Sequence, residues 1–391
     1  MNILEEIQNC PVEWKELGEV VDYEQPTKYI VSSKAYTESN EIPVLTAGQT
    51  FILGYTNEKD GIYQASKNNP VIIFDDFTTS KQWVDFKFKV KSSAMKMLTI
   101  KDEFESEVLL RYVWHYLGTI TYKPDQHGRQ WIGTYSKFLI PIPPLEIQEK
   151  IVQILDKFTD YVTELTSELT SRKKQYSFYR DKLLSFEDEV YQVEWKTLGE
   201  VAENLDNLRK PVAKGGRSSG IYPYYGASGI VDYVDSFIFD GDYLLISEDG
   251  ANLVVRRTPI AFSISGKTWV NNHAHVLKFD NMINQKFVNY YLNNHDLSPY
   301  ISGAAQPKLN QQNLNNIRIP YPPLEIQSRI VEVLDNFDTV CHDLNIGLPK
   351  EIELRQKQYE FFREKLLTFT AEGVYTDSTV QYSTDKTSLG S

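Results

Sequence analysis

The chain repeats itself once, and this repeat constrains its fold more than any other feature. Residues 12–20 read VEWKELGEV, and residues 193–201 read VEWKTLGEV, with a single difference. The segment PPLEIQ occurs at residues 143–148 and returns unchanged at residues 322–327. A period of about 180 residues is much longer than that of a solenoid repeat. The sequence therefore predicts two complete modules joined in tandem.

The segment after the first PPLEIQ predicts a long helix. Apolar residues recur at alternating steps of four and three from Ile151 to Phe186, with Arg172 as the one break. This heptad spacing is typical of a helix that buries one stripe against a second helix. A helix of about 40 residues would be roughly 60 Å long at 1.5 Å per residue. Pro143 and Pro144 prevent it from beginning earlier.

The second copy keeps the same stripe from Ile330 to Phe369. Gly347 and Pro349 lie inside it and form a stop-and-restart signal, so we expect this helix to be interrupted. Both stripes end with Lys-Gln-Tyr and Lys-Leu-Leu segments. Two such stripes in one chain predict an antiparallel pair of helices.

The two inserts between these shared segments, residues 21–140 and 202–319, agree far less. Short apolar runs closed by turn residues predict mixed structure that is rich in strands, and each insert then ends with one amphipathic helix. The clearest strands are predicted at residues 71–74 and 243–246, and the helices at residues 109–117 and 287–292. The faint parallels between the inserts include Ala47 with Ala227 and Leu98 with Leu277.

Composition supports a folded protein and gives no basic footprint for nucleic acid. The net charge is −12, which argues against a protein that binds DNA through phosphate neutralisation alone. Residues 202–319 carry 10 acidic and 11 basic groups, and residues 1–140 carry 19 and 15. If the chain binds DNA, we expect partner subunits to supply much of the electrostatic attraction.

The sequence contains partial matches to catalytic and metal-binding motifs but no complete one. Residues 266–268 (GKT) resemble the end of a phosphate-binding loop, but the first glycine of that motif is Ala261 here and the next residues predict a strand. His273 and His275 have no third ligand positioned nearby, so we expect a polar network rather than a metal site. The two cysteines have no CxxC spacing. We therefore predict neither catalytic residues nor a metal site.

Polar clusters in both inserts suit contacts with the edges of DNA bases. Arg, Lys, Asn and Gln can form the paired hydrogen bonds that distinguish guanine from adenine in the major groove. Both inserts place such a cluster shortly before the helical frame, which favours a shared role. The candidate DNA-contacting residues are Ser80, Lys81, Gln82, Gln126, His127, Arg129 and Gln130 in the first insert, and Lys267, Asn271, Asn272, His273, Gln306, Lys308, Asn310 and Gln311 in the second.

A PPLEIQ segment that opens a long helix closing with Lys-Gln-Tyr and Lys-Leu-Leu, twice in one chain, resembles the specificity subunit of type I restriction-modification enzymes. The resemblance covers residues 1–370. It extends into the inserts at residues 78–82, 265–267 and 271–273.

The resemblance implies an α+β fold in which two strand-rich target-recognition domains are separated by two long antiparallel helices, with a pseudo-two-fold internal repeat. Each domain would read one half of a bipartite site in double-stranded DNA. The implied divisions are residues 1–144 and 190–322 for the target-recognition domains, 145–189 and 323–370 for the spacer helices, and 371–391 for a disordered tail.

The resemblance also implies a non-catalytic chain that works with two modification (methyltransferase) subunits and, in a complete restriction enzyme, two restriction subunits. S-adenosylmethionine, ATP and Mg²⁺ would be bound by those partners, which would methylate adenine and cleave DNA, and this chain would bind no cofactor. The helix positions implied in partner binding are Leu155, Phe158, Leu165, Leu169, Leu334 and Phe337.

Two further features bear on the setting of the chain. The first residues lack a signal peptide, and no stretch reaches the apolar length of a membrane span, so we expect a cytoplasmic protein. The alternatives to the family interpretation are a coiled-coil scaffold, a stand-alone bipartite DNA-binding protein, and an enzyme with its own active site.

Overall fold

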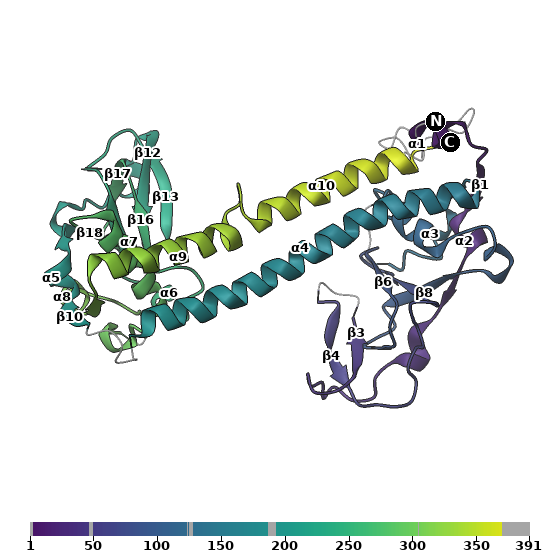
Figure 1. Cartoon of the computed structure of the whole chain (residues 1–391), viewed down its shortest axis with the longest axis horizontal. Coiled ribbons are helices and arrows are strands. Elements are labelled where there is room, and N and C mark those ends of the chain that lie inside the picture. The colour runs from purple at the N-terminus through teal and green to yellow at the C-terminus, as the bar shows by residue number, and fades with distance from the viewer. Residues whose placement is uncertain are drawn as a thin grey trace, which may run out of the picture. The chain divides into compact units, whose positions relative to one another are not determined.

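The computed structural model describes residues 3–46, 50–122, 124, 128–186, 193–303 and 305–369. These residues form two compact units. Unit 1 combines the chain up to Glu164 with the chain from Ile352 onward, and unit 2 is Leu165–Glu351. The helix α4, Leu145–Ser185, contributes to both units (Figure 1).

Unit 1 is built on a four-stranded antiparallel sheet with the order β2-β8-β5-β6. Its central strand β5 is buried along its whole length, because its run of apolar residues faces the core on both sides. The strand predicted at residues 71–74 is therefore confirmed. The strands are β2 (Val21–Glu24), β5 (Val71–Asp75), β6 (Lys81–Val84) and β8 (Met95–Ile100).

A second sheet of unit 1 has three strands in the order β4-β3-β7. Its strands are β3 (Ile42–Leu45), β4 (Ile52–Thr56) and β7 (Lys89–Val90), and β3 pairs with β7 in parallel. A two-stranded ribbon of β1 (Glu13–Glu16) and β9 (Leu139–Ile142) closes the module. The short helices are α1 (Ile3–Asn9), α2 (Leu17–Val20) and α3 (Leu110–Leu117).

Unit 2 repeats this topology although the two inserts share little sequence. Its four-stranded sheet has the order β11-β18-β15-β16, and its second sheet has the order β13-β12-β17-β14, again with one parallel pair, β12 with β17. The strands are β10 (Glu194–Thr197), β11 (Glu203–Asn204), β12 (Ser219–Gly226), β13 (Gly229–Val234), β14 (Phe239–Asp240), β15 (Tyr243–Ser247), β16 (Ala261–Ile264), β17 (Lys267–Val270), β18 (Ala274–Lys278) and β19 (Arg318–Tyr321).

One faint sequence parallel marks the shared topology. Leu98 in β8 pairs with Ile72 in β5, and Leu277 in β18 pairs with Leu244 in β15. The two leucines are therefore structural equivalents. The other parallel, Ala47 with Ala227, cannot be compared because Ala47 lies outside the described residues.

The helices of unit 2 are α5 (Leu198–Val201), α6 (Asn252–Val255), α7 (Met282–Asn294), α8 (Gln311–Asn315) and α9 (Leu324–His342). The predicted amphipathic helix at residues 287–292 is confirmed and extends further at both ends as α7. The helix α6 has no counterpart in unit 1, where β5 and β6 are joined by a short turn.

The second long helix is interrupted, as its sequence predicts. It ends at His342 and restarts as α10, Leu348–Leu367. A Cβ at Gly347 would lie 2.4 Å from the Thr339 carbonyl oxygen, so only glycine fits at this break. None of the described helices is long and apolar enough to cross a membrane.

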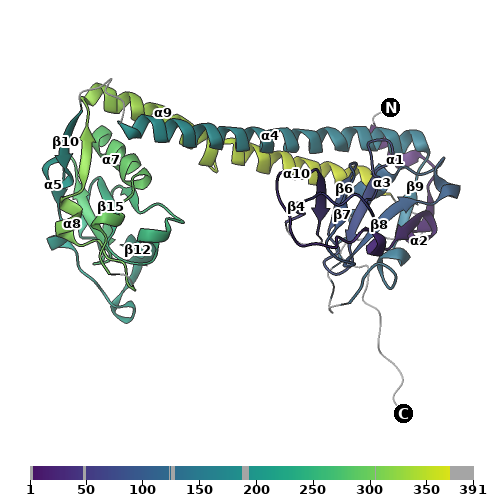
Figure 2. The ribbon, with the colours of Figure 1, turned by 90° about the horizontal axis from the view of Figure 1, so that it is seen from below.

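The long helices pack in antiparallel fashion inside each unit. In unit 1, Phe158 of α4 stacks on Phe362 of α10, with ring centroids 5.1 Å apart. In unit 2, Tyr179 of α4 stacks on Phe337 of α9 at 5.8 Å. Figures 1 and 2 show these segments side by side within each unit. The predicted antiparallel pairing is thereby confirmed.

Candidate nucleic-acid interface

Three loops of unit 2 meet at one end of β15. The Glu248 N–H donates to the His273 carbonyl at 2.9 Å, and the Leu309 N–H donates to the Glu248 carbonyl at 2.8 Å. These bonds join the loop after β15, the loop between β17 and β18, and the segment before α8. The sequence-predicted clusters at residues 271–273 and 306–311 are therefore brought together.

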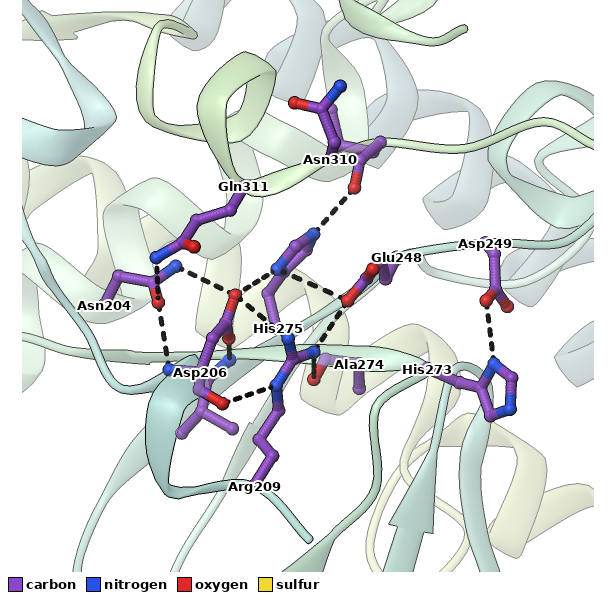
Figure 3. A network of polar contacts seen from close by, with 12 residues as sticks. Asn204, Asp206, Arg209, Glu248, Asp249, His273, Ala274, His275, Asn310 and Gln311 are labelled. Carbon is purple, nitrogen blue, oxygen red and sulfur yellow. Dashed lines mark hydrogen bonds and ion pairs between the residues drawn. The ribbon is translucent and has the colours of Figure 1, made fainter. Parts of the chain in front are cut away.

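A buried polar network supports these loops (Figure 3). The Nδ1 atom of His275 lies 2.6 Å from the Asp206 carboxylate, and its Nε2 atom lies 2.7 Å from the Leu309 carbonyl. The ring is thus held between a carboxylate and a main-chain carbonyl. Although burial raises it, the pKa of Asp206 is lowered overall by the hydrogen bond with His275 and by nearby positive charge.

A second carboxylate, Glu248, lies beside this pair. Arg209 donates to it at 2.7 Å, and the Lys308 ammonium is 3.2 Å away. Burial raises the pKa of Glu248, but these cations and His275 lower it overall. The carboxylate is therefore ionised and holds Lys308, whose side chain remains 53% exposed.

The other candidate residues of the second insert differ in accessibility. Asn272, Gln306 and Gln311 are exposed, and so is His273, which pairs with Asp249 at 2.7 Å. Asn271 is buried, and its Oδ1 accepts from the His273 N–H. The side chain of Asn310 caps α8 and is half-buried. Lys267 lies at the opposite end of β17 from this cluster.

Unit 1 has the same arrangement at the end of β5. The Asp76 N–H donates to the Ala94 carbonyl at 3.0 Å, and the Gln130 N–H donates to the Asp76 carbonyl at 2.8 Å. Asp76 occupies the place of Glu248, directly after the equivalent strand. Its Oδ1 accepts from the N–H groups of Gln130 and Trp131.

A buried lysine replaces the buried histidine in unit 1. Lys96 and Asp76 have fully buried side chains, and their charged atoms are 3.5 Å apart. Lys96 is the second residue of β8, as His275 is the second residue of β18. Arg129 reaches the outer Asp76 oxygen at 3.8 Å and stays 47% exposed. Each unit therefore has a buried acid, a buried nitrogen base and an exposed basic residue where its three loops meet. We call this place the loop corner; it lies around Asp76 in unit 1 and Glu248 in unit 2.

The remaining candidates of the first insert lie in different settings. Ser80 and Gln82 are exposed. Gln130 is buried, with its Nε2 donating to the Gly128 carbonyl at 2.9 Å. Gln126 and His127 lie outside the described residues.

Lys81 does not fit the DNA contact expected of it. Its ammonium donates to the Trp114 carbonyl in α3. Burial, with Arg363 and Arg111 nearby, lowers the pKa of Lys81 well below its usual value. In unit 2, Arg256 has the matching role, since it donates to the Leu292 carbonyl near the end of α7 at 3.1 Å. Lys81 is therefore a helix cap turned toward its own unit.

The predicted site lacks three charged residues that fix the loops and one exposed residue. The three are the buried Asp76 and Lys96 and the partly buried Glu248. Lys91 is exposed and follows β7 as Asn271 follows β17. Aligning the two copies backward from PPLEIQ pairs Arg129 with Lys308, and that alignment was the available signal.

One aspartate in each copy of the repeated helical segment, Asp156 or Asp335, attaches the module to its long helix. We call these two residues the frame aspartates. Asp156 of α4 accepts from Arg111 at 2.7 Å and contacts the buried His115 ring at 2.8 Å. Asp335 of α9 contacts Lys286 and Tyr290 of α7, both at 2.6 Å. The repeated Leu-Asp pair of the frame thus joins α3 to α4 in unit 1 and α7 to α9 in unit 2.

The helix positions implied in partner binding are only partly accessible. Leu155 and Leu334 are fully buried in the cores of their own units, so the expectation that a partner touches them is wrong. Phe158, Leu165, Leu169 and Phe337 are half-buried. Large exposed side chains on the helices are instead Tyr161, Phe178 and Phe361.

The described residues contain no group of three or more His, Cys, Asp or Glu side chains that could hold a metal ion. His273 and His275 each face a separate carboxylate. Their geometry is that of the predicted polar network.

Comparison with known proteins agrees with the repeat. The family model described as the type I restriction modification DNA specificity domain matches residues 11–172 and again residues 192–354. The specificity subunit of the EcoR124I/EcoR124II type I restriction enzyme from Escherichia coli is 43% identical over 399 residues, which cover 94% of this chain and 97% of that protein. A putative type I restriction enzyme specificity subunit from Haemophilus influenzae is 42% identical over 193 residues, covering 48% of this chain and 49% of that one.

The fold is also that of a solved relative. The S subunit of a type I restriction-modification system from M. genitalium aligns over 93% of this chain and 98% of its own, with a TM-score of 0.62 at 17% identity. The doubled specificity domain and the high identity over nearly the whole length place the chain in one family. It belongs to the DNA-specificity subunits of type I restriction-modification enzymes.

Proposed function

We propose that this specificity subunit reads a bipartite site in double-stranded DNA, with one half-site for each module. The supporting observation is that one topology occurs twice and presents the same loop corner with different side chains. The loop between the parallel-paired strand and the next strand exposes Lys91 in unit 1, and Asn272 and His273 in unit 2. A shared scaffold with unlike loops suits the reading of two different short sequences.

The chemistry would belong to partner subunits. Two modification subunits would bind S-adenosylmethionine and methylate adenine, and two restriction subunits, where present, would use ATP and Mg²⁺ for cleavage. Tyr161, Phe178 and Phe361 are more than half exposed on the long helices, so these apolar side chains are accessible to a partner. The helices would thus hold the partners and set the distance between half-sites.

Two other functions would use the same fold. A coiled-coil scaffold would need the helices but not two polar loop corners, and a stand-alone DNA-binding protein would need the corners but no partner. DNA binding measured with the chain alone and with its modification subunits separates these functions. A scaffold binds no specific DNA in either case, and a stand-alone reader needs no partner.

The decisive test exchanges one insert. Replacing residues 202–319 with the equivalent segment of a relative should change one half of the methylated sequence, because the other module and both helices are retained. Sequencing of methylated bases in the host genome provides the readout. Exchange of residues 21–140 is the matched control and should change the other half. A single exchange that altered both halves, or neither, would contradict the assignment of one half-site to each module.

A further inference from the structure

The two modules differ in most loop residues but keep one exposed basic side chain in the same place. Arg129 precedes the first PPLEIQ segment by the same number of residues as Lys308 precedes the second. About half of each side chain is exposed, at 47% and 53%. Both lie in the segment that approaches the acid at the end of the equivalent strand.

The backbone beside each basic residue is fixed in the same way. The N–H of the next residue, Gln130 or Leu309, donates to the carbonyl of Asp76 or Glu248, and both distances are 2.8 Å. The acid therefore holds the segment through its main chain as well as through its side chain. A side chain carried on backbone held like this is positioned before any ligand arrives.

The acid does not cancel the exposed charge. In unit 1, Asp76 is matched by the buried Lys96 at 3.5 Å, which leaves the charge of Arg129 unbalanced at the surface. In unit 2, Glu248 is matched by Arg209 at 2.7 Å, and Asp206 by His275 at 2.6 Å. Lys308 contacts the same Glu248 carboxylate at 3.2 Å and is the half-exposed cation of that corner. Both corners therefore present one half-exposed basic side chain to solvent.

The surrounding positions are unlike. Ala94 stands where unit 2 has His273, Lys91 where it has Asn271, and Gln130 where it has Leu309. Residues that distinguish two half-sites must differ between the modules, whereas a feature common to both cannot encode the difference. The group that every DNA sequence presents to a fixed cation is the backbone phosphate.

We propose that Arg129 and Lys308 each bind a DNA backbone phosphate in their own half-site, so that they set the register of each module without reading sequence. The inference rests on the proposed function. It changes the role of these two residues from readers of base edges to positioning residues, and it leaves base reading to their unlike neighbours.

The test uses the full chain assembled with its modification subunits, and measures its affinity for DNA carrying the methylated site at several salt concentrations. Each phosphate contact contributes a slope of about 0.9 in a plot of log affinity against log salt. Arg129→Gln and Lys308→Gln should each reduce the slope by about 0.9 and weaken binding roughly fivefold at 0.15 M salt. The methylated sequence should remain unchanged in both variants.

Two kinds of control variant test whether the effect depends on the place of the cation and on its charge. Lys278→Gln removes a cation at the far end of β18 from the corner and should leave the slope as in the wild type. Arg129→Lys and Lys308→Arg keep the charge and should keep the slope, and urea unfolding of the Gln variants shows whether a lost slope comes with a loss of stability. Unchanged slopes in both Gln variants would overturn the proposal, and so would a changed base preference in one half-site. A wild-type complex without preference for any DNA sequence would instead overturn the proposed function.

Discussion

The two modules form the same loop corner with different side chains. Both close a loop corner around an acid, but unit 1 has a single acid, Asp76, between the buried Lys96 and the half-exposed Arg129. Unit 2 instead distributes the charge over Asp206, Glu248, Arg209 and His275. The unit 1 pair is completely buried, and the unit 2 network is partly accessible. Topology and corner geometry are therefore retained although different side chains stabilise them, which suits a protein whose modules would recognise different sequences.

The largest difference between the modules should appear when the acid is removed. Asp76→Ala leaves Lys96 buried without a counter-charge and removes the side-chain acceptor of the Trp131 N–H, so it should destabilise unit 1 by about 3–5 kcal/mol. Glu248→Ala should cost only about 1–2 kcal/mol, since Arg209 keeps Asp206 at 3.3 Å. Urea unfolding of the two variants measures both values. Equal losses would show that the two corners are energetically alike.

A smaller difference should follow loss of the frame aspartates. Asp156→Ala removes the carboxylate that contacts the buried His115 and Arg111, and should cost about 2–3 kcal/mol. Asp335→Ala should cost about 1 kcal/mol, because Lys286 and Tyr290 can reach solvent. Hydrogen exchange of peptides from α3 and α7 locates each effect. A larger exchange increase in α7 than in α3 would reverse the comparison.

The smallest effect concerns pH and is specific to the contact between His115 and Asp156 in unit 1. Burial lowers the pKa of His115 despite its contact with Asp156, so the unfolded chain binds the proton more readily. Unit 1 should therefore lose stability as pH falls below about 6.5, by at most about 1.4 kcal/mol down to pH 5.5. His115→Gln should remove this component. Urea unfolding at pH 7.5 and 5.5 measures it, and a variant with the wild-type pH dependence would refute it.

Much of the fold could be predicted because it rests on local and periodic signals. The heptad stripes predict the long helices, and the Gly347 and Pro349 pair predicts the interruption of the second one. The unbroken apolar run of β5 predicts a central strand. Likewise, the repeated segments identify two modules. The common strand order of the inserts could not be derived, because pairing such as that of β12 with β17 joins segments more than 40 residues apart.

The candidate site was only partly predictable for the same reason. Residues near one another in sequence, such as Asn271 to His273, were recognised as a polar cluster. Their burial was not, since Asn271 is turned inward while Asn272 stays exposed. Lys81 was expected at the DNA and instead caps α3, because the end of that helix offers unpaired carbonyl groups within reach of its strand.

The presence of two like helical segments around two unlike inserts follows from the amino-acid sequence, since identity and periodicity are properties of the chain alone. Which charges face each other depends on the folded structure. Asp76 and Lys96, or Glu248 and Lys308, are separated by many residues and come together only when strands pair and loops close. Burial then decides their roles, because a charge removed from water must find a partner, whereas a charge left at the surface remains available to a ligand.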